Sequence, residues 1–167
     1  MNIQKSFDAI IEKYGHDVIY IRRDTQFQCD CYLERNGEAE DNCKKCFGLG
    51  NPVTLEKIRV RYKTETPAET KLQLHSNEGT VVPVEYEYFV KKEDAPKNGD
   101  LIYEVEFDEA GKAVQVLEKS FISLARPLRG TNGRIEFYQV YARNQRKDRK
   151  DDKTVAERYI QTNESCL

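Results

Sequence analysis

The sequence predicts a mainly β protein, built as a small antiparallel barrel or sandwich with an N-terminal helix, a zinc-knuckle insertion and a charged C-terminal arm. Three observations support this fold class. Short segments of alternating apolar and polar residues are separated by turn signals, which is typical of barrels and sandwiches. The chain holds 10 Tyr and 7 Phe but no Trp, a composition that favours half-buried strands. Four of its five Cys fall in one stretch that is poor in apolar residues.

The composition bounds the size of the core and the class of partner. The 167 residues suit one domain, or one domain with a small module. Hydrophobic residues make up 38% and charged residues 34%, and the formal net charge is -2. The chain as a whole is therefore not a polyanion binder. No apolar stretch approaches the ~20 residues that cross a bilayer, so we expect no membrane partner. Residues 1–6 lack a leader pattern, and we expect a reducing compartment.

Residues 1–25 predict one helix and one strand. Apolar side chains recur at helical spacing up to Tyr14, and Gly15 follows as the residue that ends the helix. The stripe consists of Ile3, Phe7, Ile10, Ile11 and Tyr14. Residues 16–23 then read as a strand.

Residues 52–142 predict the barrel. Turn signals stand at residues 98–99, 108–111 and 130–133. Pro83 makes the start of its segment an edge or a bulge. The strand candidates are residues 53–62, 71–75, 80–90, 101–107, 112–125 (one long or two short strands) and 135–141.

Residues 26–51 form a predicted metal-binding insertion. The cysteines are arranged as Cys29-x-Cys31 and, after eleven residues, Cys43-x-x-Cys46. Zn²⁺ favours four soft ligands in a tetrahedron, and two close pairs reach one ion when the chain between them loops back. Four Cys ligands indicate a closed, structural zinc site. An iron–sulfur cluster or another ion, disulfides and free thiols are the alternatives.

The second cysteine pair carries further signs of a zinc knuckle. Gly48 and Gly50 permit positive-φ turns that direct backbone amides at sulfur. Lys44 and Lys45 lie between the two cysteines and favour their thiolate forms. Residues 43–50 also resemble the Cys-x-x-Cys-x-Gly-x-Gly repeat of J-domain co-chaperones, which we interpret as shared knuckle geometry without shared function.

No residue pattern predicts catalysis, and we expect the protein not to be an enzyme. His16 and His75 are the only histidines, and no nucleophile motif or phosphate-binding loop accompanies them. Several carboxylates alternate with apolar residues, which predicts the solvent-facing side of a sheet. These carboxylates are Glu85, Glu87, Glu104, Glu106 and Asp108. The fifth cysteine, Cys166, is expected to be an inert exposed thiol.

Basic residues gather late in the chain. Residues 143–153 contain no apolar side chain, so 143–167 is interpreted as a charged arm, solvated or disordered. The bland interpretation is a solvated surface, and the functional one is contact with an acidic protein or with passing DNA. The basic cluster consists of Arg126, Arg129, Arg134, Arg143, Arg146, Lys147, Arg149 and Lys150.

The layout up to about Arg143 resembles the neck proteins of tailed bacteriophages, in the head-closure or head-completion class. The resemblance is carried by Tyr-Gly-His-Asp-Val-Ile-Tyr-Ile-Arg at 14–22, by the cysteine module, by Lys-Asn-Gly-Asp-Leu-Ile at 97–102 and by Arg-Gly-Thr-Asn-Gly at 129–133.

This resemblance implies a small barrel subunit in a homo-oligomeric ring of six or twelve copies. Such a ring binds the portal or adaptor on one face and the tail on the other, and it helps to retain packaged DNA. It would be assembled in the bacterial host cytoplasm and lie in the virion neck. A tail or baseplate structural protein and a zinc-ribbon nucleic-acid-binding protein are the alternatives.

Overall fold

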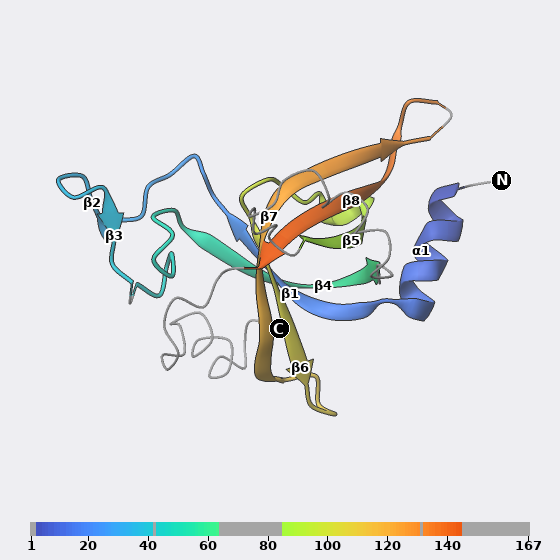
Figure 1. Cartoon of the computed structure of the whole chain (residues 1–167), viewed down its shortest axis with the longest axis horizontal. Coiled ribbons are helices and arrows are strands. Elements are labelled where there is room, and N and C mark those ends of the chain that lie inside the picture. Colours follow the sequence, from blue (N-terminus) through green and yellow to red (C-terminus); the bar gives the residue numbers. More distant parts are fainter. Residues whose placement is uncertain (1–2, 42, 64–84, 131, 145–167) are drawn as a thin grey trace, which may run out of the picture.

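Six antiparallel strands close into a barrel in the computed structural model, which describes residues 3–41, 43–63, 85–130 and 132–144 (Figure 1). Neighbouring strands follow the order β1-β4-β5-β8-β7-β6, and β6 pairs with β1 to close the ring. The mainly β fold with an antiparallel barrel is confirmed. The barrel strands are β1 (His16–Arg23), β4 (Val53–Lys63), β5 (Glu85–Lys91), β6 (Leu101–Phe107), β7 (Ala113–Arg129) and β8 (Ile135–Asn144).

The interior of the barrel is an apolar core to which every barrel strand contributes. Its buried members are Val18, Tyr20, Ile58, Val60, Tyr88, Val90, Ile102, Ile122, Val140 and Ala142. A second cluster lies on the other face of β1 and β6 and includes Ile19, Ile21 and Leu101. Because β1 is buried on both faces, its apolar residues run consecutively from 18 to 21 instead of alternating.

The helix α1 (Ile3–Tyr14) packs on the outside of the barrel, over β4, β5 and β8. The ring of Phe7 stacks on Phe137, with the ring centroids 3.9 Å apart. The helix ends at Gly15 as predicted, because space there admits only glycine. A Cβ at Gly15 would lie 2.4 Å from the carbonyl oxygen of Ile11 and 2.7 Å from that of Val60.

Most strand predictions agree with the structure, with differences at the ends. The strands 16–23 and 101–107 have the predicted bounds. The segment predicted at 112–125 is one long strand, β7, which bulges and continues to Arg129. Strand β8 continues to Asn144, so the first two residues of the predicted arm belong to the sheet. The candidate strand 71–75, residues 80–84 and the arm after 144 lie outside the described residues.

The insertion contains a two-stranded hairpin, β2 (Tyr32–Leu33) and β3 (Glu38–Ala39), which composition did not predict. Figure 1 shows this hairpin standing away from the barrel, at the opposite end of the long axis from α1. A single 3-10 turn, η1 (Lys92–Asp94), follows β5. Within the described residues, no helix has the length and apolar character to cross a membrane.

Candidate metal centre

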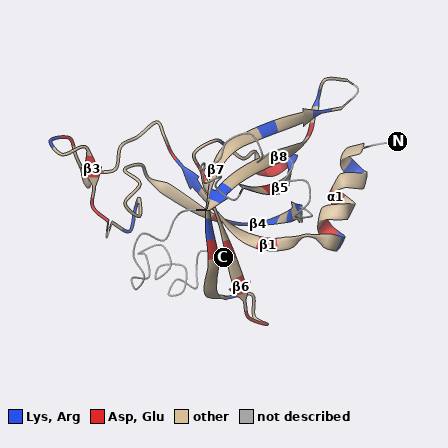
Figure 2. Cartoon of the chain, in the orientation of Figure 1, with Lys and Arg blue, Asp and Glu red and all other residues tan. Residues whose placement is uncertain are grey.

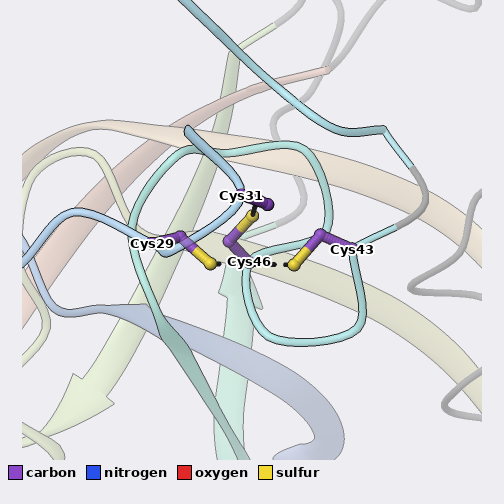
Figure 3. A group of neighbouring side chains, drawn as sticks. All are labelled: Cys29, Cys31, Cys43 and Cys46. Atoms are coloured by element: carbon purple, nitrogen blue, oxygen red, sulfur yellow. Dashed lines mark hydrogen bonds between the residues drawn. The ribbon is translucent and has the colours of Figure 1, made fainter. Parts of the chain in front are cut away.

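The structure brings together the four cysteines of the insertion, Cys29, Cys31, Cys43 and Cys46 (Figure 3). The Sγ atoms of Cys29 and Cys43 are 3.6 Å apart, and those of Cys31 and Cys46 are 3.4 Å apart. All four Sγ atoms lie within 4.8 Å of one another, and all four thiols are free. A tetrahedron with metal–sulfur bonds of ~2.3 Å has edges of about 3.8 Å. The cluster therefore fits a tetrahedral metal ion with little movement.

The hairpin β2–β3 explains why two cysteine pairs so far apart in sequence converge. Cys29 and Cys31 precede β2, while Cys43 and Cys46 follow β3, and the hairpin returns the chain to its starting point. The amide of Cys29 donates a hydrogen bond to the carbonyl oxygen of Gly50 at 2.9 Å, which joins the two ends of the insertion. This backbone hydrogen bond, together with the contacts between Sγ atoms, places the first cysteine pair against the second.

The second pair forms a knuckle of the kind that the glycines predict. Residues 47, 48 and 50 all have positive φ, of 51°, 77° and 78° respectively. The amides of Gly48 and Gly50 donate hydrogen bonds to the sulfur of Cys46, and the amides of Lys45 and Cys46 donate to that of Cys43. The predicted role of the two glycines is confirmed. Donors directed at sulfur stabilise thiolate charge before any ion is bound.

The surroundings divide the thiols electrostatically. Burial raises the pKa of the Cys43 thiol, but hydrogen bonds from the Lys45 amide, the neighbouring Cys31 and Cys29 thiols and the Cys46 amide together outweigh burial and bring that pKa to about 7. Burial and hydrogen bonds to neighbouring thiols raise the pKa of Cys31 to about 12. Ion binding must therefore displace protons, at least from Cys31, and its affinity depends on pH.

An ion pair closes the outer side of the site. Lys45 lies between the second pair of cysteines, and its Nζ atom is 2.7 Å from the Oδ2 atom of Asp30, which lies between the first pair. Hydrogen bonding to Lys45 lowers the pKa of Asp30. Electrostatic attraction to Cys29 and Cys43 also contributes to a raised pKa of the Lys45 ammonium. Since both partners of the pair are exposed, we expect the pair itself to stabilise the fold little.

Side chains from both sides join the insertion to the barrel. Phe47 and Leu49 pack against the second apolar cluster, beside Ile19 and Ile21 of β1. Arg23, the last residue of β1, donates from Nη2 to the Oδ1 atom of Asn51 at 2.8 Å. Arg23 also donates from Nη1 to the carbonyl oxygen of Gly99 at 3.2 Å. The metal centre is therefore attached to the barrel by packing and hydrogen bonds, although its hairpin stands clear of it.

A polar cluster at one end of the barrel interior was not predicted. The Nε2 atom of His16 lies 2.9 Å from the Oε2 atom of Glu104, and the Tyr88 hydroxyl also bonds to this carboxylate. The Tyr86 hydroxyl donates to Glu118 at 2.5 Å. Glu104 and Glu118 are register partners on β6 and β7. Two separate sets of hydrogen bonds, one around Glu104 and one between Tyr86 and Glu118, therefore provide partners for these polar groups beside the apolar core.

The interpretation of the alternating carboxylates as solvent-facing is wrong for Glu87 and Glu104. Glu87 is only 4% exposed and pairs with Lys63, whose Nζ atom lies 2.8 Å from its Oε2 atom. Glu104 falls on the interior side of β6, because the other side of that strand is covered by the second apolar cluster. No local pattern in the sequence indicates this position. Glu118 becomes the register partner of Glu104 only when β6 and β7 pair.

The fold keeps three of the described members of the basic cluster near one turn and separates the fourth from them. Arg126, Arg129 and Arg134 lie exposed near the turn of the β7–β8 hairpin, and Arg143 is exposed near the end of β8. The remaining basic residues of the cluster, like His75 and Cys166, lie outside the described residues.

Comparison with models of known protein families finds none that matches this chain, and comparison with curated protein sequences finds no match either. The functional conclusion therefore depends on the geometry of the chain itself.

Proposed function

We propose that this protein is a structural component of the neck of a tailed bacteriophage, in which a ring of copies joins the portal or adaptor to the tail. In this role the ring helps to retain packaged DNA, is assembled in the bacterial host cytoplasm and ends in the virion. The observation that supports this proposal best is a small closed barrel that carries a four-sulfur centre on a projecting hairpin. Four Cys ligands leave no open coordination position, so such a centre braces a structure and does not bind substrate.

Zinc is the ion that we assign to the four sulfurs. A tetrahedral site of four thiolates is typical of zinc or of iron–sulfur chemistry. Zinc supplies folding free energy to the segment whose ligands it gathers. The insertion needs such a source, since its buried side chains among the described residues are those of Cys29 and Cys46.

Ring formation suits a barrel of this size. The chain keeps large apolar side chains partly exposed on α1, on β7 and on the insertion, including Tyr14, Leu117 and Phe27. Contacts between copies would cover such surface, and stability would then rise with protein concentration. An interface between two different patches of the same chain closes into a ring when its rotation permits.

Two measurements on the purified full-length chain test the proposal. Elemental analysis should find one zinc per chain, and negative-stain images should show rings, alone or with candidate neck proteins. Iron in place of zinc would overturn the assignment of the ion. A chain that forms no ring and binds no neck component would overturn the assembly role. A tail or baseplate protein would instead assemble only with components from that part of the virion.

The second candidate function is a zinc-ribbon nucleic-acid-binding protein. The exposed arginines at the turn of the β7–β8 hairpin favour it, because guanidinium groups bind phosphate. This function predicts that the monomer binds DNA or RNA oligonucleotides with an affinity that falls steeply as salt rises. Failure to bind any oligonucleotide at low salt would exclude it.

A further inference from the structure

The insertion presents an acidic, partly apolar surface. Residues 26–51 hold five acidic residues and three basic ones, and a divalent ion on four thiolates would add two further negative charges. Glu34, Glu38 and Glu40 are exposed and form no ion pair with any described residue. Two large apolar side chains are exposed beside them, Phe27 at 62% and Leu33 at 54%.

The turn of the β7–β8 hairpin presents the opposite charge. Arg126, Arg129 and Arg134 are exposed, and Glu136 is the one acidic residue between positions 126 and 140. Arg129 donates to the carbonyl oxygen of Gly133 at 2.8 Å, and none of the three guanidinium groups forms an ion pair with a described residue. The apolar Leu124, 45% exposed, lies on the same hairpin.

These two surfaces lie at opposite ends of the long axis of the molecule, so they cannot meet within one chain (Figure 1). Figure 2 shows acidic residues along β3 and the loop after it, and basic residues along the β7–β8 hairpin. We propose that the acidic metal-binding insertion of one copy docks on the basic β7–β8 hairpin of the next copy. The contact is heterologous, because it joins two different patches, and it repeats from copy to copy until the ring closes.

Both the charge and the apolar surface fit this occupant. Opposite charges steer the two copies together and fix their register, while repulsion between like charges disfavours other pairings. Phe27 and Leu33 then find apolar surface at Leu124, in an interface with a polar rim. A bound metal ion would hold the docking hairpin rigid before association and so lower the entropic cost of this contact. This inference rests on the proposed ring and names the surfaces that would build it.

Charge reversal in the full-length, zinc-loaded chain tests the contact. The insertion variant carries Glu34→Lys with Glu38→Lys, and the hairpin variant carries Arg126→Glu with Arg134→Glu. Alone, each variant should dissociate at a concentration at least about tenfold above that of the wild type, because like charges then face one another. Mixed in equal amounts, the two should assemble again, alternating around an even-membered ring. The chain with all four substitutions should also regain assembly.

The control reverses two charges at the β6–β7 turn, Glu106→Lys with Glu109→Lys, where the side chains are also exposed. This control should assemble like the wild type in sedimentation velocity, and every variant should keep one zinc per chain. Rings that persist in both reversal variants would overturn this inference and leave the proposed function standing. A mixture that assembles no better than its components would overturn it as well. A wild-type chain that never associates would overturn the ring itself.

Discussion

The barrel and the insertion of this chain are held together by different interactions. The barrel closes a ring of hydrogen-bonded strands around ten buried side chains. The insertion has two strands of two residues each, and its buried side chains among the described residues are two of the four cysteines. A segment of that composition cannot offset its conformational entropy by burial alone. Apolar packing therefore accounts for the order of the barrel, whereas the insertion depends on backbone hydrogen bonds and on the cluster of four cysteines.

The two regions meet at a small joint. Phe47 and Leu49 of the knuckle pack against β1, and Arg23 bonds to Asn51 and Gly99 on either side of it. The joint contains few residues compared with the barrel core, so a defect in one region should be felt only weakly in the other.

Removal of one metal ligand should disorder the insertion and spare the barrel. Cys43→Ser removes a ligand whose thiol already has a pKa of about 7. Zinc binding to structural sites is worth on the order of 10 kcal/mol, so we expect the zinc content to fall far below one per chain. Limited proteolysis should then cut within residues 26–51, while the near-ultraviolet circular dichroism of the barrel tyrosines persists.

The matched control is Cys166→Ser, which replaces the cysteine outside the predicted ligand set. It should keep its zinc and its resistance to protease. Equal behaviour of the two variants would contradict the assignment of Cys43 as a ligand, and collapse of the barrel in Cys43→Ser would contradict the separation of the two regions.

Truncation in the barrel core should have the reverse effect. Ile102 is fully buried in the interior cluster, and Ile102→Ala should lower the free energy of unfolding by about 2–5 kcal/mol. The zinc affinity of the folded protein should stay within about twofold of the wild type. Chemical denaturation and a competitive zinc titration measure the two quantities. Glu109→Ala, at an exposed side chain of the β6–β7 turn, is the control and should change the free energy of unfolding by less than about 0.5 kcal/mol.

Local signals in the sequence predicted most of the barrel. The alternation in residues 101–107 and the turn residues at 108–111 can be recognised in the sequence alone. The structure places Gly111 of that turn at a positive φ and confirms the strand that precedes it. The four sulfurs were also readable, because cysteine spacing reports a metal site directly. The long β7 was harder, since its bulges break the alternation that defines a strand.

Long-range pairing was the information that the sequence did not reveal. Glu104 looked solvent-facing because its neighbours Tyr103 and Val105 are apolar. Both sides of β6 are in fact covered, and strand pairing places Glu104 opposite Glu118 and beside His16. The interaction between His16 and Glu104 spans 88 positions, so no local pattern indicates it. The positions of the acidic insertion and the basic hairpin could not be predicted from local patterns either. Only the fold shows that these two surfaces lie far apart and exposed.

The smallest effect expected is a pH dependence that arises in the barrel alone. Hydrogen bonding to Glu104 raises the pKa of His16 above its ordinary value of 6.5, against the opposing effect of burial. The protonated pair therefore stabilises the fold fully below pH 6.5, and this contribution is lost as the pH rises through the higher pKa of the folded state. Because the His16 side chain is 43% exposed, the contribution should be below about 1 kcal/mol.

The zinc-loaded His16→Gln variant should show a flatter dependence of unfolding free energy on pH above 6.5, whereas His75→Gln should follow the wild type. The difference between variants isolates the effect of His16 from that of Cys43, whose thiol pKa of about 7 lies in the same pH range. Parallel profiles for all three proteins would show that the His16–Glu104 contact contributes nothing to stability.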